Sequence, residues 1–211
     1  MSRTLKDLLA QGAEAAAAVS APGRPTLSHG ALRLLIDATL ARLNGLGLGR
    51  NDRVAIVLDN GPEMATCFLA CANGVASAPL NPSYRADEFE FYLSDLNAKA
   101  LIVGRGSASP AVDVAVKLGV PIIDLVSDAA SPAGSFTLEP RRAGAATPAT
   151  NGGYAAPEDV SMVLHTSGTT SRPKIVPLSQ CNLAASASNI ARTLQFSSKD
   201  CGLNIMPLFH I

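Results

Sequence analysis

The sequence carries no excess of charge of either sign. Among its 211 residues, 17 lysines and arginines balance 17 aspartates and glutamates, and the charged residues are not bunched. Without a basic or acidic field, long-range attraction to nucleic acids or anionic lipids is weak. The composition therefore argues against nucleic-acid and membrane-surface partners.

Long apolar runs and cysteine motifs are also missing. No stretch reaches the roughly 18 consecutive apolar residues of a membrane span, and the first residues lack the apolar core of a signal peptide. Cys67 and Cys71 are four residues apart, while Cys181 and Cys201 are isolated. This spacing fits neither a metal site nor a disulfide framework. We expect a cytoplasmic protein with buried free thiols, no membrane span and no metal-ligating residues.

Short apolar runs alternate with helical patterns along much of the chain. Continuous apolar runs that are bounded by turns and separated by helices indicate strands buried on both faces of a mainly parallel sheet. The expected strands are 54–58, 75–80, 100–103 and 121–125, and the expected helices centre on 32–43, 64–71 and 89–96. The predicted fold class is therefore α/β, with mainly parallel sheets flanked by helices.

A change of composition divides the chain. Residues 127–159 are rich in proline, glycine, alanine, serine and threonine, which is typical of a linker or surface excursion. We therefore predict a first α/β lobe at 1–126 and the start of a second α/β unit at 160–211, with a helix over 179–194 and an extended run over 203–206. Because the chain stops on an apolar segment, we expect a truncated C-terminus.

The most informative segment is Thr-Ser-Gly-Thr-Thr-Ser-Arg-Pro-Lys at 166–174, directly after the apolar run 160–165. Hydroxyls and backbone amides can donate to phosphate oxygens, Gly168 allows close approach, and Arg172 and Lys174 supply positive charge. An ordinary turn or linker is the alternative. The position between two apolar segments favours a polyphosphate site.

Two common nucleotide motifs are absent. The pattern G-x-x-x-x-G-K-[ST] would need glycine at Pro173 and a hydroxyl at Ile175. No G-x-G-x-x-G follows the expected strand 54–58, where Asp-Asn-Gly-Pro stands at 59–62. The loop is therefore not the common P-loop, and a dinucleotide-dependent Rossmann enzyme is disfavoured.

The loop at 165–174 resembles the signature of the adenylate-forming superfamily, which includes acyl-CoA synthetases, luciferases and peptide-synthetase adenylation domains. That signature is usually written T-S-G-[ST]-T-G-x-P-K-G, and Ser171 and Ile175 each replace a glycine of it. The variant with Ser171 is similar to that of oxalate–CoA ligases. Further segments resemble the family in the same order, at 59–63, 78–82, 88–96 and 206–210.

The resemblance implies the N-terminal part of the large domain of such an enzyme. The partners would be a small carboxylate, ATP and coenzyme A, with Mg²⁺ and the missing C-terminal part of the same chain. A carboxylate would attack ATP to give an acyl-adenylate and pyrophosphate, and the thiol of coenzyme A would then displace AMP. Because the family's ribose-binding aspartate, hinge and catalytic lysine are absent here, we expect these 211 residues alone to be inactive.

The same resemblance assigns roles to residues. Those implied to bind the β- and γ-phosphates are Thr166, Ser167, Gly168, Thr169, Thr170 and Lys174. Lys174 would act as an electrostatic clamp during catalysis, and His210 would contact the acyl group or adenylate. We interpret His165, His29 and Arg85 as structural, and Asp95 as part of a solvated helix face.

Two alternatives to an oxalate–CoA ligase stay open. A medium-chain or aryl acyl-CoA ligase would use the same chemistry, and the choice of oxalate depends only on the loop variant. A short non-catalytic protein that binds nucleotides or partners belongs to a different class.

Overall fold

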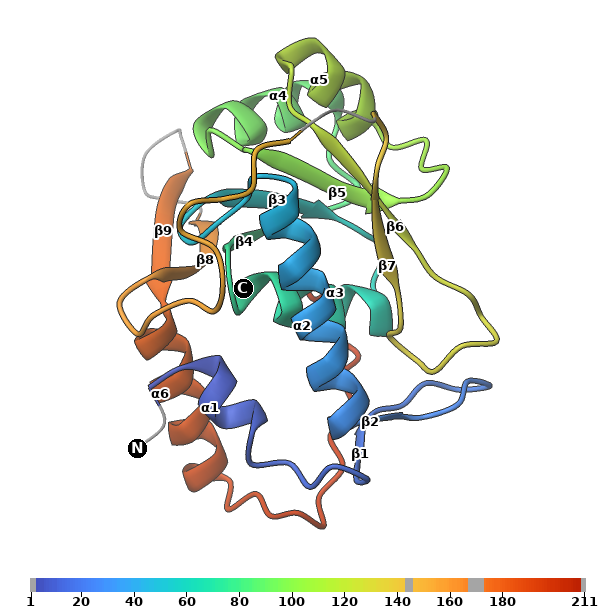
Figure 1. Ribbon diagram of the computed structural model, residues 1–211, viewed down its shortest axis with the longest axis vertical. Coiled ribbons are helices and arrows are strands. Elements are labelled where there is room, and N and C mark those ends of the chain that lie inside the picture. Colours follow the sequence, from blue (N-terminus) through green and yellow to red (C-terminus); the bar gives the residue numbers. More distant parts are fainter. Residues whose placement is uncertain (1–2, 143–145, 167–172, 210–211) are drawn as a thin grey trace.

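The computed structural model describes residues 3–142, 146–166 and 173–209, and a seven-stranded sheet forms its centre (Figure 1). The strand order is β7-β6-β5-β3-β4-β8-β9. Neighbouring strands are parallel except at the two edges, where β7 pairs antiparallel with β6 and β9 pairs antiparallel with β8. The strands are β3 (Arg53–Val57), β4 (Ala76–Pro79), β5 (Ala100–Gly104), β6 (Ile122–Val126), β7 (Thr137–Pro140), β8 (Val160–Thr166) and β9 (Lys174–Ser179). The predicted α/β class with a mainly parallel sheet is confirmed.

Helices cover both faces of this sheet (Figure 1). The helices are α1 (Leu5–Leu9), α2 (His29–Gly45), α3 (Pro62–Ala72), α4 (Ala86–Asp95), α5 (Pro110–Leu118) and α6 (Gln180–Thr193), and a small hairpin joins β1 (Ala17–Val19) to β2 (Leu27–Ser28). Side chains alternate between faces along a strand. Accordingly, Val54 and Ile56 of β3 pack with α2 and α3, whereas Ala55 and Val57 pack with α4 and α5.

The helix ends follow sequence signals. Ser28 Oγ accepts a hydrogen bond from the Ala31 amide at 3.2 Å and caps α2. Pro62 begins α3, where a missing N–H costs no helical hydrogen bond. Gly119 ends α5 at φ +70°, a left-handed conformation that glycine adopts without strain. The helices expected around 32–43, 64–71 and 89–96 are confirmed as α2, α3 and α4.

The sheet takes strands from all three predicted spans. β7 lies within 127–159, and β8 joins the sheet beside β4 with Ser77 opposite Met162. The division at 126 and 160 into separate units stays a prediction. The expected extended run over 203–206 forms no strand, and Leu203 there is 88% exposed.

The cysteines differ in part from expectation. All four thiols are free, as predicted, and Cys67 and Cys71 are buried, but Cys181 is only half-buried and Cys201 is exposed. The prediction of burial is therefore wrong for Cys201. No helix in the described part of the chain is both long and apolar enough to cross a membrane.

Candidate functional site

The β8–β9 hairpin holds the two ends of the predicted phosphate loop. Its antiparallel register places Thr166 directly opposite Lys174 (Figure 1). The other predicted phosphate ligands, Ser167, Gly168, Thr169 and Thr170, lie outside the described residues, and so does His210. The loop thus starts and ends at one pair of facing residues, both of which were predicted to bind phosphate.

Lys174 presents an available positive charge at this position. Its side chain is exposed and forms no hydrogen bond or ion pair with another described residue. Thr166 is half-buried beside it. A lysine without a carboxylate partner can approach an anionic ligand without first breaking an ion pair.

The strand residue that precedes the loop is anchored to α4. His165 has a side chain only 6% exposed, and its Nε2 lies 3.0 Å from Asp95 Oδ2. Because an ionised carboxylate only accepts hydrogen bonds, Nε2 carries the proton and donates it. The ring of Tyr92 packs edge-on against the imidazole, with the two centroids 4.7 Å apart. This arrangement holds the end of β8 against α4.

Two opposing effects act on the pKa of the His165 imidazole. Burial lowers the pKa of the imidazole, and the hydrogen bond and charge of Asp95 oppose that shift. Since the net pKa is lowered from its usual value of 6.5, the ring is neutral at neutral pH. A neutral ring fits a structural role in this buried position.

A buried glutamine anchors the other strand of the hairpin. Gln180 follows β9, and its Nε2 donates to the Ala72 carbonyl and to Ser161 Oγ, while its Oε1 accepts from the Leu5 amide at 3.0 Å. Ser161 Oγ also donates to the Ala72 carbonyl at 2.8 Å. The sequence did not single out Gln180, because a polar residue at the start of an expected helix gives no sign of burial.

A cavity of about 880 Å³ lies at the carboxyl ends of β3, β5 and β6. Asp59, Asn60 and Arg105 are among its lining residues. In parallel sheets, ligands commonly bind at this end of the strands. The Leu208 amide donates to Asn60 Oδ1 at 3.0 Å, which brings the segment before His210 to one side of the cavity.

The remaining sequence candidates occupy helix starts. His29 is the first residue of α2, and Arg85 precedes α4 with its amide donating to Glu88 Oε2 at 2.8 Å. Among the residues that the structure describes, no three histidine, cysteine, aspartate or glutamate side chains gather as a metal site.

Comparison with known proteins identifies the family of this chain. A model described as AMP-binding enzyme matches residues 7–211. An oxalate–CoA ligase of Arabidopsis thaliana is 39% identical over 202 residues, which cover 92% of this chain and 38% of that protein. An oxalate–CoA ligase of Saccharomyces cerevisiae is 37% identical over 182 residues, which cover 77% of this chain and 34% of that protein. The chain therefore spans well under half the length of these relatives.

A solved structure shares the fold. ATP-bound MatB from Rhodopseudomonas palustris matches 100% of this chain and 41% of its own, with a TM-score of 0.78 and 22% sequence identity. At that identity the likeness concerns the arrangement of the sheet and helices alone.

Proposed function

Because this chain belongs to the AMP-binding enzyme family, we propose that the whole protein is an ATP-dependent carboxylate–CoA ligase. A carboxylate oxygen attacks the α-phosphorus of ATP, and pyrophosphate leaves. The thiol of coenzyme A then attacks the acyl carbon of the adenylate, and AMP leaves. The observation that carries the proposal is the pairing of Thr166 with Lys174 at the base of the hydroxyl-rich loop.

The chemical obstacle is charge, since an anionic acid must approach an anionic triphosphate. Catalysis of phosphoryl transfer depends mainly on positioning and on groups that stabilise the charge growing on the leaving phosphates. In the proposal, Lys174 supplies that positive charge, and Thr166, Ser167, Gly168, Thr169 and Thr170 supply hydrogen-bond donors. His210 contacts the acyl group.

Magnesium belongs to the proposal only as an ion that arrives with the nucleotide. The described residues offer no cluster of carboxylates for it, whereas Mg²⁺ commonly binds through substrate phosphates, waters and one or two carboxylates. The residues of this chain are therefore assigned to the phosphates and not to the metal.

The substrate we propose is oxalate or another small dicarboxylic acid. Its support is the loop variant with Ser171 together with the two relatives named oxalate–CoA ligase. Since the chain covers 38% of the first relative, we propose that further residues of the whole protein complete the nucleotide site. A cytoplasmic location is part of the same proposal.

The test is ATP–pyrophosphate exchange by the whole protein with oxalate, malonate, decanoate and benzoate. We expect the fastest exchange with oxalate. Faster exchange with decanoate or benzoate than with oxalate would contradict the choice of oxalate and favour a medium-chain or aryl acyl-CoA ligase. Binding of ATP without exchange for any acid would favour the non-catalytic alternative.

A further inference from the structure

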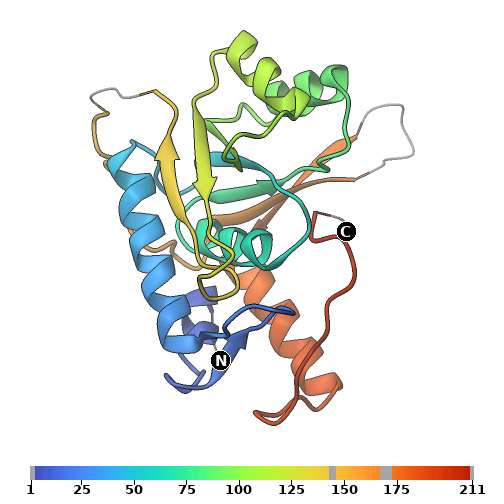
Figure 2. The ribbon, with the colours of Figure 1, turned by 90° about the vertical axis from the view of Figure 1, so that its right-hand side faces the viewer.

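A second cavity, of about 590 Å³, lies where β5 and β6 begin. The end of α5, the turn after α2 and the end of β7 close its sides. β7 and β9 are the two outer strands, and they lie on opposite sides of the molecule in Figure 2. Because β3 and β4 separate the strands of this cavity from the β8–β9 hairpin, it is distinct from the candidate phosphate site.

The floor of the cavity is apolar. Lining residues of this kind are Leu46, Leu48, Val116, Val120, Ile122 and Ile123. Val116 is 58% exposed, although Ala111, Val114 and Ala115 of the same helix α5 are buried. A cavity of this size and composition can hold the apolar body of a small ligand, which would also cover Val116.

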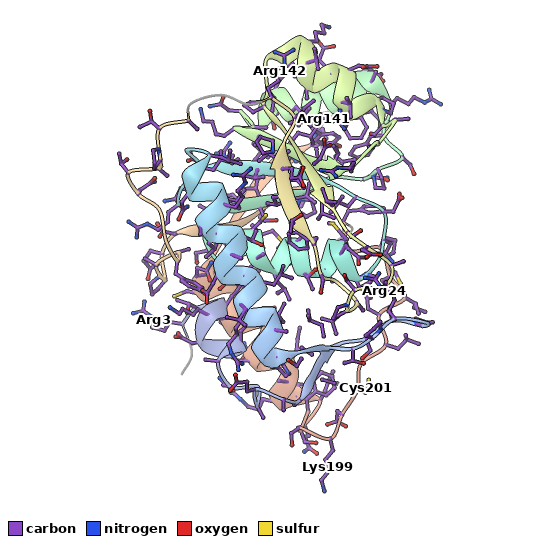
Figure 3. All side chains as sticks on the ribbon, turned by 45° about the vertical axis from the view of Figure 1, so that its right-hand side comes forward. Arg3, Arg24, Arg141, Arg142, Lys199 and Cys201 are labelled. Atoms are coloured by element: carbon purple, nitrogen blue, oxygen red, sulfur yellow. The ribbon has the colours of Figure 1, made fainter. Side chains whose placement is uncertain are left out.

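The rim is positively charged. Lys99, Arg141 and Arg142 line the cavity, and among the residues that the structure describes no aspartate or glutamate does. Figure 3 shows Arg141 and Arg142 together at the end of β7. Neither the side chain of Lys99 nor that of Arg142 forms a hydrogen bond or ion pair with another described residue.

The neighbouring acids do not neutralise this rim. On β6, Asp124 accepts a hydrogen bond from Arg141 Nε at 2.8 Å, and on β7, Glu139 pairs with Arg105. These two acids are therefore already matched by two arginines, and Lys99 and Arg142 remain in excess. The C-terminal end of α5 contributes a partial negative charge of about half a unit, which is smaller than that excess.

We propose that this cavity binds an amphipathic organic anion, with an aliphatic chain on the apolar floor and a carboxylate or phosphate head at Lys99 and Arg142. The guanidinium of Arg141 uses Nε for Asp124, so its two terminal nitrogens stay available to the same head group. Decanoate and decyl phosphate represent the two sources of such a head group, a free fatty acid and a phosphate ester.

The experiment measures binding of decanoate, decyl phosphate and decanol to the protein by calorimetry. We expect both anions to bind and the neutral alcohol to bind about tenfold more weakly or not at all, because it lacks the charge that the rim recognises. The anion that binds with the lower Kd identifies whether the natural ligand is a free fatty acid or a phosphate ester. Equal binding of decanol and the anions would overturn the proposal.

The matched variants are Lys99→Gln with Arg142→Gln, and Lys199→Gln as the control. Lys199 lies at the far end of the molecule from Arg142 (Figure 3) and in the exposed turn after α6. We expect the double change to weaken anion binding about tenfold and the control to leave it unchanged. Val116→Asp, at an exposed helix position, should abolish binding. Unchanged affinity in the double variant would contradict the proposal.

Two further measurements keep the test independent of the variants and of the proposed ligase activity. Bound decanoate should slow the reaction of Lys99 with acetic anhydride, as read by mass spectrometry of the unaltered protein. Saturating ATP should not displace decanoate, because the two sites use different strands. Displacement by ATP, or unprotected Lys99, would assign the anion to another site even if the ligase proposal holds.

Discussion

The Nε2 atom of His165 lies 3.0 Å from the Oδ2 atom of Asp95, which joins the end of β8 to the last residue of α4. The pair spans 70 positions of sequence. His165 is followed immediately by Thr166, where the hydroxyl-rich loop begins. The end of β8, where the loop begins, is therefore held by a helix that is distant in the sequence.

The first prediction concerns the strength of this contact. Asp95→Asn removes the negative charge that raises the pKa of His165, while burial continues to lower it. We expect a further decrease of the His165 pKa and a loss of about 1 kcal/mol in the free energy of unfolding. NMR titration of the imidazole and urea unfolding measure the two effects. An unchanged pKa would show that Asp95 does not act on the ring.

The second prediction concerns pH. The pKa of His165 is lower in the folded protein than its usual value of 6.5. Between the folded-state pKa and 6.5, the unfolded chain therefore binds more protons than the folded protein. The stability that the neutral His165 contributes is complete above pH 6.5 and decreases as the pH falls toward the folded-state pKa. His165→Gln should flatten this part of the curve. Urea unfolding of both proteins between about pH 7.5 and about pH 5 tests the expectation. Parallel curves for the two proteins would contradict it.

The third prediction concerns the buried amide of Gln180. Gln180→Met keeps the approximate volume but leaves the Leu5 amide without its acceptor, while the Ala72 carbonyl keeps only the hydrogen bond from Ser161 Oγ. We expect a loss of about 2 kcal/mol, because each buried unsatisfied group is costly.

Asn189→Met on the exposed side of the same helix provides the matched control, with an expected change within about 0.5 kcal/mol. Both are measured by denaturant unfolding. Equal effects of the two changes would mean that Gln180 contributes no more than a surface residue.

The fourth prediction concerns Lys174 in the whole protein. Lys174→Ala should reduce the rate of ATP–pyrophosphate exchange about a hundredfold, on the scale of removing one preorganised group that stabilises transition-state charge. Lys174→Arg keeps the charge and should retain part of the rate.

Stability should be unchanged, because the Lys174 side chain is exposed and without a partner among the described residues. Lys199→Ala controls for the loss of a surface charge. Full exchange activity in the Lys174→Ala protein would remove this residue from the proposed mechanism.

Much of the fold could be predicted because its signals are local. Helix α2 shows a cap and a helical period, and β3 shows a continuous apolar run, so each can be recognised from a few neighbouring residues. Helix α5 was not predicted, since Val112, Val114 and Val116 alternate as in a strand. The signals that could have revealed the helix are its start at Ser109-Pro110 and its end at Gly119.

Long-range contacts could not be predicted. Asp95 was interpreted as part of a solvated helix face, and its side chain is indeed 39% exposed, but it also holds His165. Likewise β7 lies in a stretch whose proline and glycine content is typical of a linker, and only pairing with β6 makes it a strand. The site residues at the ends of the loop followed from motif resemblance, while their register across the hairpin needed the structure.

The two outer strands of the sheet share a chemical property with a consequence for solubility. β7 ends in Pro140, and β9 contains Pro177. Proline has no N–H group, so neither edge strand offers a complete row of hydrogen-bond donors to a strand from another molecule. Charged Glu139 and Lys174 on the same strands add a desolvation cost to such stacking. The sheet is thereby protected at both borders against growth into fibrillar aggregates.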